Sequence, residues 1–205
     1  MTTSSIRQLN QIAAPRLRVL FLGYDQKQSR LIDLLIDQRC EVYHTAQQLK
    51  DSTCDLIISF GYRHIINATT LNRLSCPAVN LHIAYLPFNK GSHPNFWSFY
   101  DQTPSGVTIH LIDGGLDTGP ILYQKYVNFN PEAMTFRQTQ AGLKFEIEAL
   151  FTNHLEDILN FNWSPKPQSS AGTRHKTCDL PVAFSGWDQN IADEMRRLKH
   201  AEGSD

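Results

Sequence analysis

Three polar side chains with complementary chemistry stand in or just after two apolar, strand-like runs. Asn80 and His82 lie two residues apart in the run Ala78–His82, and Asp117 follows the run Gly106–Ile112 across a glycine-rich segment. Because side chains alternate between the two faces of a strand, Asn80 and His82 project from the same face. An amide, an imidazole and a carboxylate can together hold a water molecule, move a proton and stabilise charge. We therefore take these three as the candidate catalytic residues.

Two other uses of the same residue types compete with this interpretation. His110 shares a strand face with Thr108, and it could act as the base or be a packed histidine that orients the following loop. A metal site for a hydrolase would draw on His82, His93, His110, Asp113 and Asp117. Their spacing matches no strong metal pattern, such as two histidines one helical turn apart, so we expect no metal.

The segments before these runs predict the sheet that positions them. Apolar runs at Leu17–Gly23 and Cys54–Gly61, with a helical pattern over Ser29–Arg39 and a short run at Glu41–His44 between them, indicate a parallel sheet with helices on its faces. Ligands of such sheets bind beyond the carboxyl ends of the strands, which the candidate residues follow. Gly23 stands alone after the first run, so no dinucleotide or phosphate-loop fingerprint is present.

Length and composition indicate one large globular domain. In the 205 residues we expect a flexible N-terminal arm over residues 1–16, a catalytic domain over residues 17–163, and a linker with a short C-terminal tail and helix over residues 164–205. A formal net charge of −1 without a long basic run argues against nucleic acid as a partner. No signal-peptide pattern and no long apolar run is present, so we expect a cytoplasmic protein with no membrane partner. The cysteines are Cys40, Cys54, Cys76 and Cys178. They lack metal-ligand spacing, and we expect reduced, buried thiols.

Four motifs, together with Gly91, carry a resemblance to a known family: Asn80-Leu81-His82, Leu86-Pro87, Gly106–His110, and Asp113-x-x-x-Asp117-Thr118-Gly119. Together they resemble the catalytic core of the formyltransferases that use 10-formyltetrahydrofolate. Residues 59–66, 85–100 and 172–175 look most similar to the sugar N-formyltransferases of the dTDP-4-amino-4,6-dideoxyglucose formyltransferase type. The resemblance implies a Rossmann-like α/β fold with an open, twisted, mostly parallel sheet and helices on both faces, of the formyltransferase N-terminal-domain type.

The resemblance also implies an activity and a set of roles. The protein would move a formyl group from 10-formyltetrahydrofolate to the amine of a nucleotide-linked 4-amino-4,6-dideoxy sugar, such as a dTDP-sugar, for lipopolysaccharide O-antigen biosynthesis. Asn80 would donate to the oxyanion of a tetrahedral intermediate, His82 would stabilise charge and transfer a proton, and Asp117 would hold a water or the histidine. Folate contacts are implied for Tyr62, Arg63, His64, Ile65, Asp113, Gly114, Gly115 and Leu116. Sugar-nucleotide contacts are implied for Lys90, Asn95, Trp97, Arg174 and Lys176.

Differences from other branches of the family limit which molecule could accept the formyl group. The first loop lacks the Gly-Asn-Gly-Ser-type phosphate cradle of the glycinamide ribonucleotide relatives, and we expect no additional domain of the kind in the initiator-tRNA relatives. We therefore expect neither glycinamide ribonucleotide nor initiator tRNA as the acceptor. The alternatives are formyl transfer to another amine, a folate-dependent formyl hydrolase, and a non-catalytic sugar-nucleotide-binding module. A homodimer, formed through edge strands or the long helix, is a further expectation.

Overall fold

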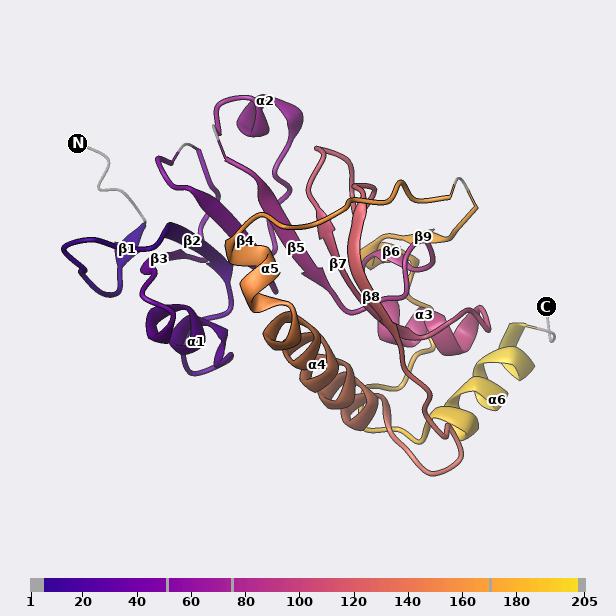
Figure 1. The fold of residues 1–205 in the computed structure, drawn as a ribbon. Helices are drawn as coiled ribbons and strands as arrows, with labels where there is room; N and C mark the ends of the chain where they lie inside the picture. The colour runs from indigo at the N-terminus through magenta and orange to yellow at the C-terminus, as the bar shows by residue number, and fades with distance from the viewer. Residues whose placement is uncertain (1–5, 51, 75, 170, 203–205) are drawn as a thin grey trace. The chain divides into compact units, whose positions relative to one another are not determined.

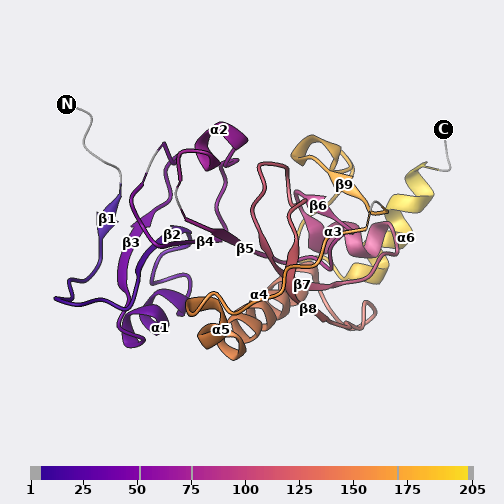
Figure 2. The ribbon, with the colours of Figure 1, turned by 45° about the horizontal axis from the view of Figure 1, so that its top comes forward.

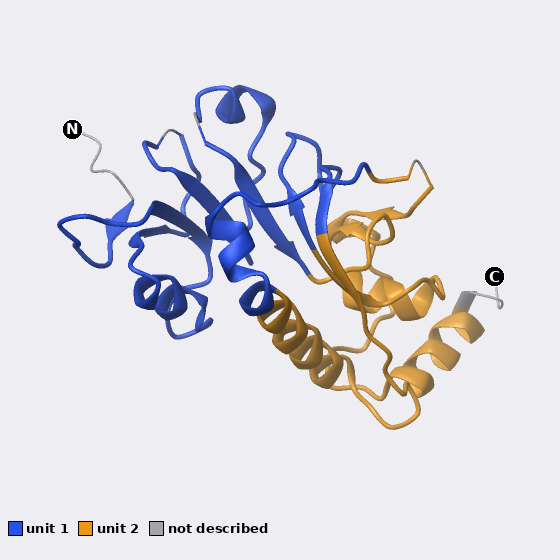
Figure 3. Ribbon diagram, viewed as in Figure 1, with its two compact units in different colours: residues 1–82, 109–122, 151–167 blue, residues 83–108, 123–150, 168–205 orange. Residues whose placement is uncertain are grey.

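The structure is a computed structural model that describes residues 6–50, 52–74, 76–169 and 171–202 (Figure 1). Its strands are β1 Arg7–Gln8, β2 Arg18–Gly23, β3 Glu41–Thr45, β4 Leu56–Phe60, β5 Ala78–His82, β6 Lys90–Gly91, β7 Gly106–Leu111, β8 Ile121–Tyr126 and β9 Arg174–His175. Its helices are α1 Leu31–Asp37, α2 Ala68–Leu71, α3 Pro94–Tyr100, α4 Phe136–Asn153, α5 Leu155–Leu159, a 3₁₀ turn Thr177–Asp179 and α6 Ile191–Glu202. Two compact units divide the chain (Figure 3). Unit 1 comprises residues 1–82, 109–122 and 151–167, and unit 2 comprises residues 83–108, 123–150 and 168–205.

A seven-stranded sheet has the strand order β1-β3-β2-β4-β5-β7-β8. β2 pairs in parallel with β3 and with β4, β4 pairs in parallel with β5, and β1 is antiparallel to β3. Strands β3, β2, β4 and β5 lie side by side in both views of the ribbon (Figures 1 and 2). The expected α/β class with an open, mostly parallel sheet is therefore confirmed.

The core of unit 1 forms on strands whose apolar runs are continuous. Leu20 and Leu22 of β2 and Ile57 of β4 pack against Ile66 and Leu74, which flank α2. The residues that alternate with these along the two strands are also buried. Continuous rather than alternating burial is typical of strands covered on both faces. Each such side chain stabilises the fold by about 1.5–3 kcal/mol.

The segment expected to be a flexible arm contains a two-residue edge strand, β1, and makes further hydrogen bonds to the sheet. β1 pairs with β3, and Asn10 then bonds to the backbone of the same region. Its Oδ1 accepts from the N–H of Val42 at 2.7 Å, and its Nδ2 donates to the carbonyl oxygen of Cys40 at 2.9 Å. The Asn10 side chain thus satisfies two backbone groups at the edge of the sheet. The sequence pattern of this segment, polar with isolated apolar residues, did not indicate this contact. Residues 1–5 of the expected arm lie outside the described residues.

Unit 2 is built around the aromatic side chains of α3. Phe96 and Trp97 pack against Phe136 of α4 and against Ile191 and Leu198 of α6. The rings of Phe96 and Phe136 have centroids 5.7 Å apart. The aromatic run after Pro94 therefore contributes Phe96 and Trp97 to the core of unit 2.

The segment expected to be a linker and tail is also structured. Lys166 bridges Ile121 within unit 1. In unit 2, β9 pairs in parallel with β6, with Arg174 opposite Lys90. The last helix, α6, lies within the expected C-terminal tail, begins at Ile191 and packs on α3. No helix among the described residues is both long and apolar enough to cross a membrane.

Candidate active site

Strand β5 positions Asn80 and His82. Asn80 lies opposite Ser59 of β4 in the parallel ladder, and the intervening Leu81 is buried. The two polar side chains therefore share the face that strand alternation predicts. His82 is the last residue of β5, so it lies at the carboxyl end of the strand, where ligands of parallel sheets bind.

A tight loop after β7 carries Asp117. The loop closes where the N–H of Leu111 donates to the carbonyl oxygen of Pro120 at 2.9 Å. A Cβ on Gly119 would lie 1.8 Å from the carbonyl oxygen of Leu111, so only glycine fits there. Asp117 itself has φ 54°, a left-handed conformation that aspartate tolerates better than most residues. The backbone conformation that positions Asp117 is therefore one that few other sequences can adopt.

Asp113 holds this loop together from inside. Its Oδ1 accepts from the N–H of Gly115 at 3.0 Å and from the hydroxyl of Thr118 at 2.7 Å. Gly114 has φ 88°, and its Cβ position would lie 3.1 Å from the backbone nitrogen of Ala68 at the start of α2. The Asp113 carboxylate, predicted as a folate contact, therefore has a role within the loop. Thr118 is a supporting residue that sequence reasoning did not assign, although it belongs to the Asp117-Thr118-Gly119 motif.

The three predicted catalytic side chains come together in unit 1. Nδ2 of Asn80 lies 3.2 Å from Oδ1 of Asp117, and Nε2 of His82 lies 3.7 Å from Oδ2 of the same carboxylate. One oxygen therefore accepts from the amide, while the other faces the imidazole at an ion-pair distance that exceeds a normal hydrogen bond. The carboxylate stands between an amide donor and a proton-carrying ring.

His110 of β7 is the fourth member of the cluster. Its Nε2 lies 3.1 Å from Nδ2 of Asn80 and 3.6 Å from Oδ1 of Asp117. Its Nδ1 lies 2.8 Å from the carbonyl oxygen of Leu111, which can only accept, so Nδ1 carries a hydrogen. In the neutral ring Nε2 then accepts from Asn80, whose second amide hydrogen goes to Asp117. This geometry makes His110 an orienting partner of the Asn80 amide. From the sequence it was open whether His110 is the base or a packed histidine that orients the following loop.

The cluster is largely covered. The side chains of His82 and Asp117 are each 10% exposed and that of His110 is 3% exposed. Removal from water strengthens electrostatic interactions among such groups. The described residues contain no group of three or more His, Cys, Asp or Glu side chains arranged to hold a metal ion.

The loop after β4 carries four predicted folate contacts. The Tyr62 hydroxyl donates to the carbonyl oxygen of Gln47 at 2.8 Å and accepts from the N–H of Leu49 at 2.8 Å, and burial raises the pKa of Tyr62. Tyr62 is therefore an anchor of the loop. The next three residues are exposed, and Ile65 is 64% exposed although it is a large apolar side chain.

The predicted sugar-nucleotide contacts divide into two groups within unit 2. Asn95 is buried; its Nδ2 donates to the carbonyl oxygen of Phe136 at 2.9 Å and its Oδ1 accepts from the hydroxyl of Thr139 at 3.0 Å. Trp97 is also buried and stacks on His175 with ring centroids 3.8 Å apart. These two side chains are used within the core, which disfavours direct contact with a substrate. The cations Lys90, Arg174 and Lys176 lie on or beside the β6–β9 pair and are at least partly exposed.

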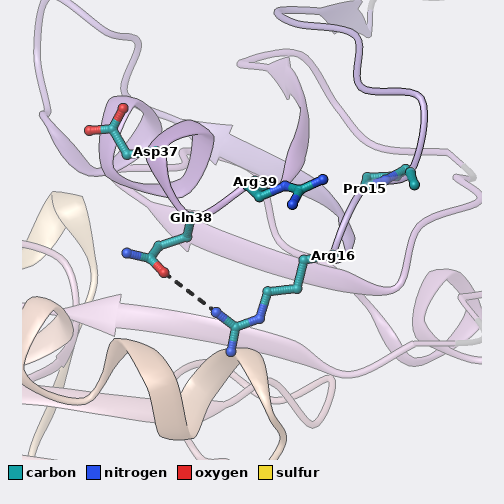
Figure 4. A pocket seen from close by; sticks show the side chains of 6 residues that line it. Pro15, Arg16, Asp37, Gln38 and Arg39 are labelled. Atoms are coloured by element: carbon teal, nitrogen blue, oxygen red, sulfur yellow. Dashed lines mark hydrogen bonds between the residues drawn. The ribbon is translucent and has the colours of Figure 1, made fainter.

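A pocket of about 430 Å³ lies elsewhere in unit 1 (Figure 4). It is lined by Ala14, Pro15, Arg16, Asp37, Gln38 and Arg39. Figure 4 shows the guanidinium of Arg16 reaching the side chain of Gln38, with Nη1 and Oε1 3.5 Å apart. These residues precede β2 and β3, so the pocket is at the amino ends of the strands, and the catalytic candidates lie at the opposite edge of the sheet.

A family model for formyl transferases matches residues 35–153, more than half of the chain. The chain belongs to the formyl transferase family. The matched residues include β5, β7 and the Asp117 loop, so the whole cluster of Asn80, His82, His110 and Asp117 lies inside the formyl transferase region.

Three relatives illustrate the similarity to other formyl transferases. The crystal structure of the formyltransferase PseJ from Anoxybacillus kamchatkensis, in complex with UDP-4,6-dideoxy-4-formamido-L-AltNAc and tetrahydrofolate, matches with 38% identity and a TM-score of 0.77, over 85% of this chain and 96% of that one. The methionyl-tRNA formyltransferase of Deinococcus radiodurans is 32% identical over 63% of this chain. The dTDP-4-amino-4,6-dideoxyglucose formyltransferase of Mycobacterium bovis is 36% identical over 42% of this chain. The chain spans 40% and 36% of the lengths of the latter two proteins.

Proposed function

We propose that this protein transfers a formyl group from 10-formyltetrahydrofolate to the amine of a nucleotide-linked 4-amino-4,6-dideoxy sugar. The observation that carries the proposal is the convergence of Asn80, His82 and Asp117 in a chain of the formyl transferase family. The acceptor class is supported by the similarity to PseJ over nearly all of that chain. Cytoplasmic location and supply of a formylated sugar for lipopolysaccharide O-antigen belong to the same proposal.

Each catalytic residue has a chemical task under this proposal. Bound 10-formyltetrahydrofolate would supply a formyl carbon for attack by the sugar amine, with negative charge developing on the formyl oxygen. His82 takes the proton of the attacking amine, because an imidazole changes charge near neutral pH. Asp117 stabilises the positive charge that His82 then carries, since its Oδ2 lies 3.7 Å from Nε2. His82 would return this proton to N10 of the folate as the bond between the formyl carbon and N10 breaks and tetrahydrofolate leaves. Asn80 donates to the formyl oxygen through the N–H that faces His110. The ring and the oxyanion would share this N–H, because an anionic oxygen is a stronger acceptor than a neutral ring nitrogen.

The loops beside the cluster fit a flat, partly apolar ligand such as a pterin. Ile65, at 64% exposure, offers apolar contact area, and Gly115 is exposed in the loop that carries Asp117. Ligand sites combine apolar walls with a few backbone donors and acceptors in this way. We infer that Tyr62–Ile65 and Gly114–Leu116 contact the folate, chiefly through backbone groups.

Two cations in unit 2 fit the diphosphate of a sugar nucleotide. Lys90 and Arg174 are direct partners across the β6–β9 pair. Like charges opposite one another destabilise a sheet, and an anion bound between them would relieve the repulsion. Lys176, two residues beyond Arg174, adds a third cation to the same segment. We infer that these residues bind the diphosphate, while Asn95 and Trp97 support the fold around them.

A direct assay tests the proposal. The full chain is incubated with 10-formyltetrahydrofolate and, in separate reactions, with UDP- and dTDP-linked 4-amino-4,6-dideoxy sugars, and the mass of the sugar nucleotide is measured. We expect a formylated product from at least one of them, and a loss of rate of about 10²–10³ in His82→Ala with unchanged thermal unfolding. A folded protein that binds tetrahydrofolate and formylates none of these sugars would overturn the proposed acceptor.

The same assay separates the other candidates. The match to a methionyl-tRNA formyltransferase over 63% of this chain favours methionyl-tRNA as a second acceptor to include. Release of formate without any amine would indicate a hydrolase, and ligand binding that is insensitive to His82→Ala and without turnover would indicate a binding module. Light scattering of the purified chain tests the proposed homodimer.

A further inference from the structure

Two of the cysteines lie in contact at the amino ends of neighbouring strands. Sγ of Cys54 and Sγ of Cys76 are 3.5 Å apart, and each residue precedes its strand, β4 or β5, by two positions. Both are half-buried, whereas Cys40 is buried and Cys178 is exposed, so the expectation of four buried thiols holds for Cys40 alone. We propose that Cys54 and Cys76 form a site of reversible oxidation, at which a small-molecule disulfide such as oxidised glutathione is reduced and a Cys54–Cys76 disulfide forms.

Backbone hydrogen bonds beside the two cysteines hold the sulfurs in place. The residue after the first cysteine, Asp55, donates its N–H to the carbonyl oxygen of Arg18 at 2.8 Å. The residue after the second, Pro77, accepts at its carbonyl oxygen from the N–H of Ile57 at 3.0 Å. Both positions are therefore part of the sheet ladder. The sulfurs meet because β4 and β5 are neighbours in the sheet. A disulfide requires them to close from 3.5 Å to about 2.05 Å.

The pKa values of the two thiols are shifted in opposite directions. The two sulfurs are within hydrogen-bond distance, and either can donate. The bond to Cys76, with a second from the side chain of Ser52, lowers the pKa of Cys54 to about 7 against the opposing effect of burial. The same thiol–thiol bond, together with burial, raises the pKa of Cys76. A thiolate is the attacking species in thiol–disulfide exchange. Cys54 is therefore the attacking cysteine at neutral pH, and Cys76 is the resolving cysteine.

The reaction balances in two steps. The thiolate of Cys54 attacks one sulfur of glutathione disulfide, so that a mixed disulfide forms on Cys54 and one glutathione thiolate leaves. Cys76 then gives its proton to solvent, attacks the sulfur of Cys54 and expels the second glutathione thiolate. The two protein thiols lose two electrons, and glutathione disulfide gains them as it becomes two molecules of glutathione.

This site is separate from the candidate active site. β5 runs from Ala78, two residues after Cys76, to His82 at its carboxyl end. A disulfide would join β4 to β5 at their amino ends and leave the catalytic candidates at the other edge of the sheet. The inference therefore does not depend on the proposed formyl transfer and can be tested without any substrate.

Thiol counting by mass spectrometry tests the proposal. The fully reduced Cys178→Ser protein is exposed to oxidised glutathione, quenched with acid, unfolded and alkylated. We expect two of its three thiols to be lost to alkylation with no glutathione retained, and dithiothreitol to restore them. An unreduced tryptic digest of the wild-type protein should contain fragment 51–63 linked to fragment 74–90. The rate should rise with pH about a midpoint near 7, because the thiolate of Cys54 is the attacking form.

Matched variants separate this mechanism from general thiol reactivity. Cys76→Ser should hold glutathione on Cys54 without a cross-link. Cys54→Ser should react about 10-fold more slowly, because burial still raises the pKa of the remaining thiol, Cys76. Cys40→Ser should behave as wild type. Retention of all three thiols, or a mixed disulfide on Cys54 that persists while Cys76 is present, would overturn the proposal. If a variant does not fold, the wild-type protein alone still tests the proposal. Absence of the cross-linked fragment pair 51–63 and 74–90 after complete oxidation of the wild-type protein would also overturn it.

Discussion

Nδ2 of Asn80 and Nε2 of His110 lie 3.1 Å apart, and they join β5 to its neighbour β7 through side chains. Because Nδ1 of His110 donates to the backbone carbonyl of Leu111, the neutral ring can only accept at Nε2. The histidine thus selects which way the amide of Asn80 points and directs its two N–H groups toward His110 and Asp117. The donor proposed for the oxyanion is therefore oriented before any substrate binds.

Removing the acceptor on His110 should weaken catalysis moderately. In His110→Leu, Asn80 loses a neutral hydrogen bond of about 0.5–1.5 kcal/mol, so we expect kcat to fall about 2–10-fold with little change in KM. In His110→Gln, the side-chain oxygen can accept in its place, and part of the rate should return. Steady-state kinetics on both variants provide the test, and equal losses would argue against an orienting role.

Changing the amide itself should be far more costly. Asn80→Ala removes the donor and should lower kcat by about 10²–10³. Asn80→Asp also places a second carboxylate beside Asp117, whose Oδ1 lies 3.2 Å from the wild-type Nδ2. Two carboxylates this close cannot both ionise easily, so the rate of Asn80→Asp should recover partly as the pH is lowered, whereas that of Asn80→Ala should not. Rate profiles that are parallel in pH would contradict this prediction.

The loop that carries Asp117 should not tolerate a side chain at Gly119. In Gly119→Ala, the new Cβ would lie 1.8 Å from the carbonyl oxygen of Leu111, which is backbone and cannot move aside easily. We expect a loss of about 1–3 kcal/mol in the free energy of unfolding, together with a loss of turnover as Asp117 shifts. Gly186→Ala is a control, because no atom lies within 4 Å of its Cβ position and only its positive φ of 123° opposes the change. Denaturant unfolding and activity of the two variants should therefore differ, with Gly119→Ala the more damaged in both.

Sugar-nucleotide affinity should depend on the paired cations of unit 2. Lys90→Ala or Arg174→Ala should raise KM for the sugar nucleotide about 10-fold or more with a smaller change in kcat, because a hydrogen bond to a charged group contributes about 1.5–3 kcal/mol. KM for the folate should stay near wild type. Lys199→Ala, an exposed cation on α6, is the matched control. A change confined to kcat would show that Lys90 and Arg174 do not bind the diphosphate.

Stability at low pH should depend on Glu194 of α6. Its carboxylate accepts from Arg197, at 2.7 and 2.9 Å, and from the N–H and hydroxyl of Ser185, each at 2.7 Å. The bonds to Arg197 and then those to Ser185 lower the pKa of Glu194 from 4.5 to about 2, against the opposing effect of burial. A folded-state pKa below the unfolded value stabilises the fold above pH 4.5, and this stabilisation is lost as the pH falls toward 2.

Thermal unfolding of Glu194→Gln measures that contribution. The variant should have a lower Tm than wild type at neutral pH, and the difference should shrink below pH 4.5 and be smallest near pH 2. Asp193→Asn, which removes an exposed ion pair with Arg196 on the same helix, should change Tm little at any pH. A Tm difference for Glu194→Gln that is constant with pH would show that lost packing, and not lost charge, is responsible.

Local patterns predicted much of the scaffold. The continuous apolar runs of β2 and β4 and the alternation in β5 were enough to predict a parallel α/β sheet with Asn80 and His82 on one face. Asp117 could be added because strand ends of a parallel sheet meet at one edge. The N-terminal edge strand and the buried Asn95 were not predictable, because both depend on partners distant in the chain, namely β3 and Phe136.

By itself, then, the sequence determined the fold class, the family motifs and three candidate catalytic residues, because strand periodicity and motif spacing are local properties. Only the tertiary structure decided that His110 orients Asn80 and that Cys54 and Cys76 touch. These contacts depend on which strands are neighbours and in which register they pair. Strand neighbours and register arise from packing between distant segments, and no short stretch of sequence specifies them.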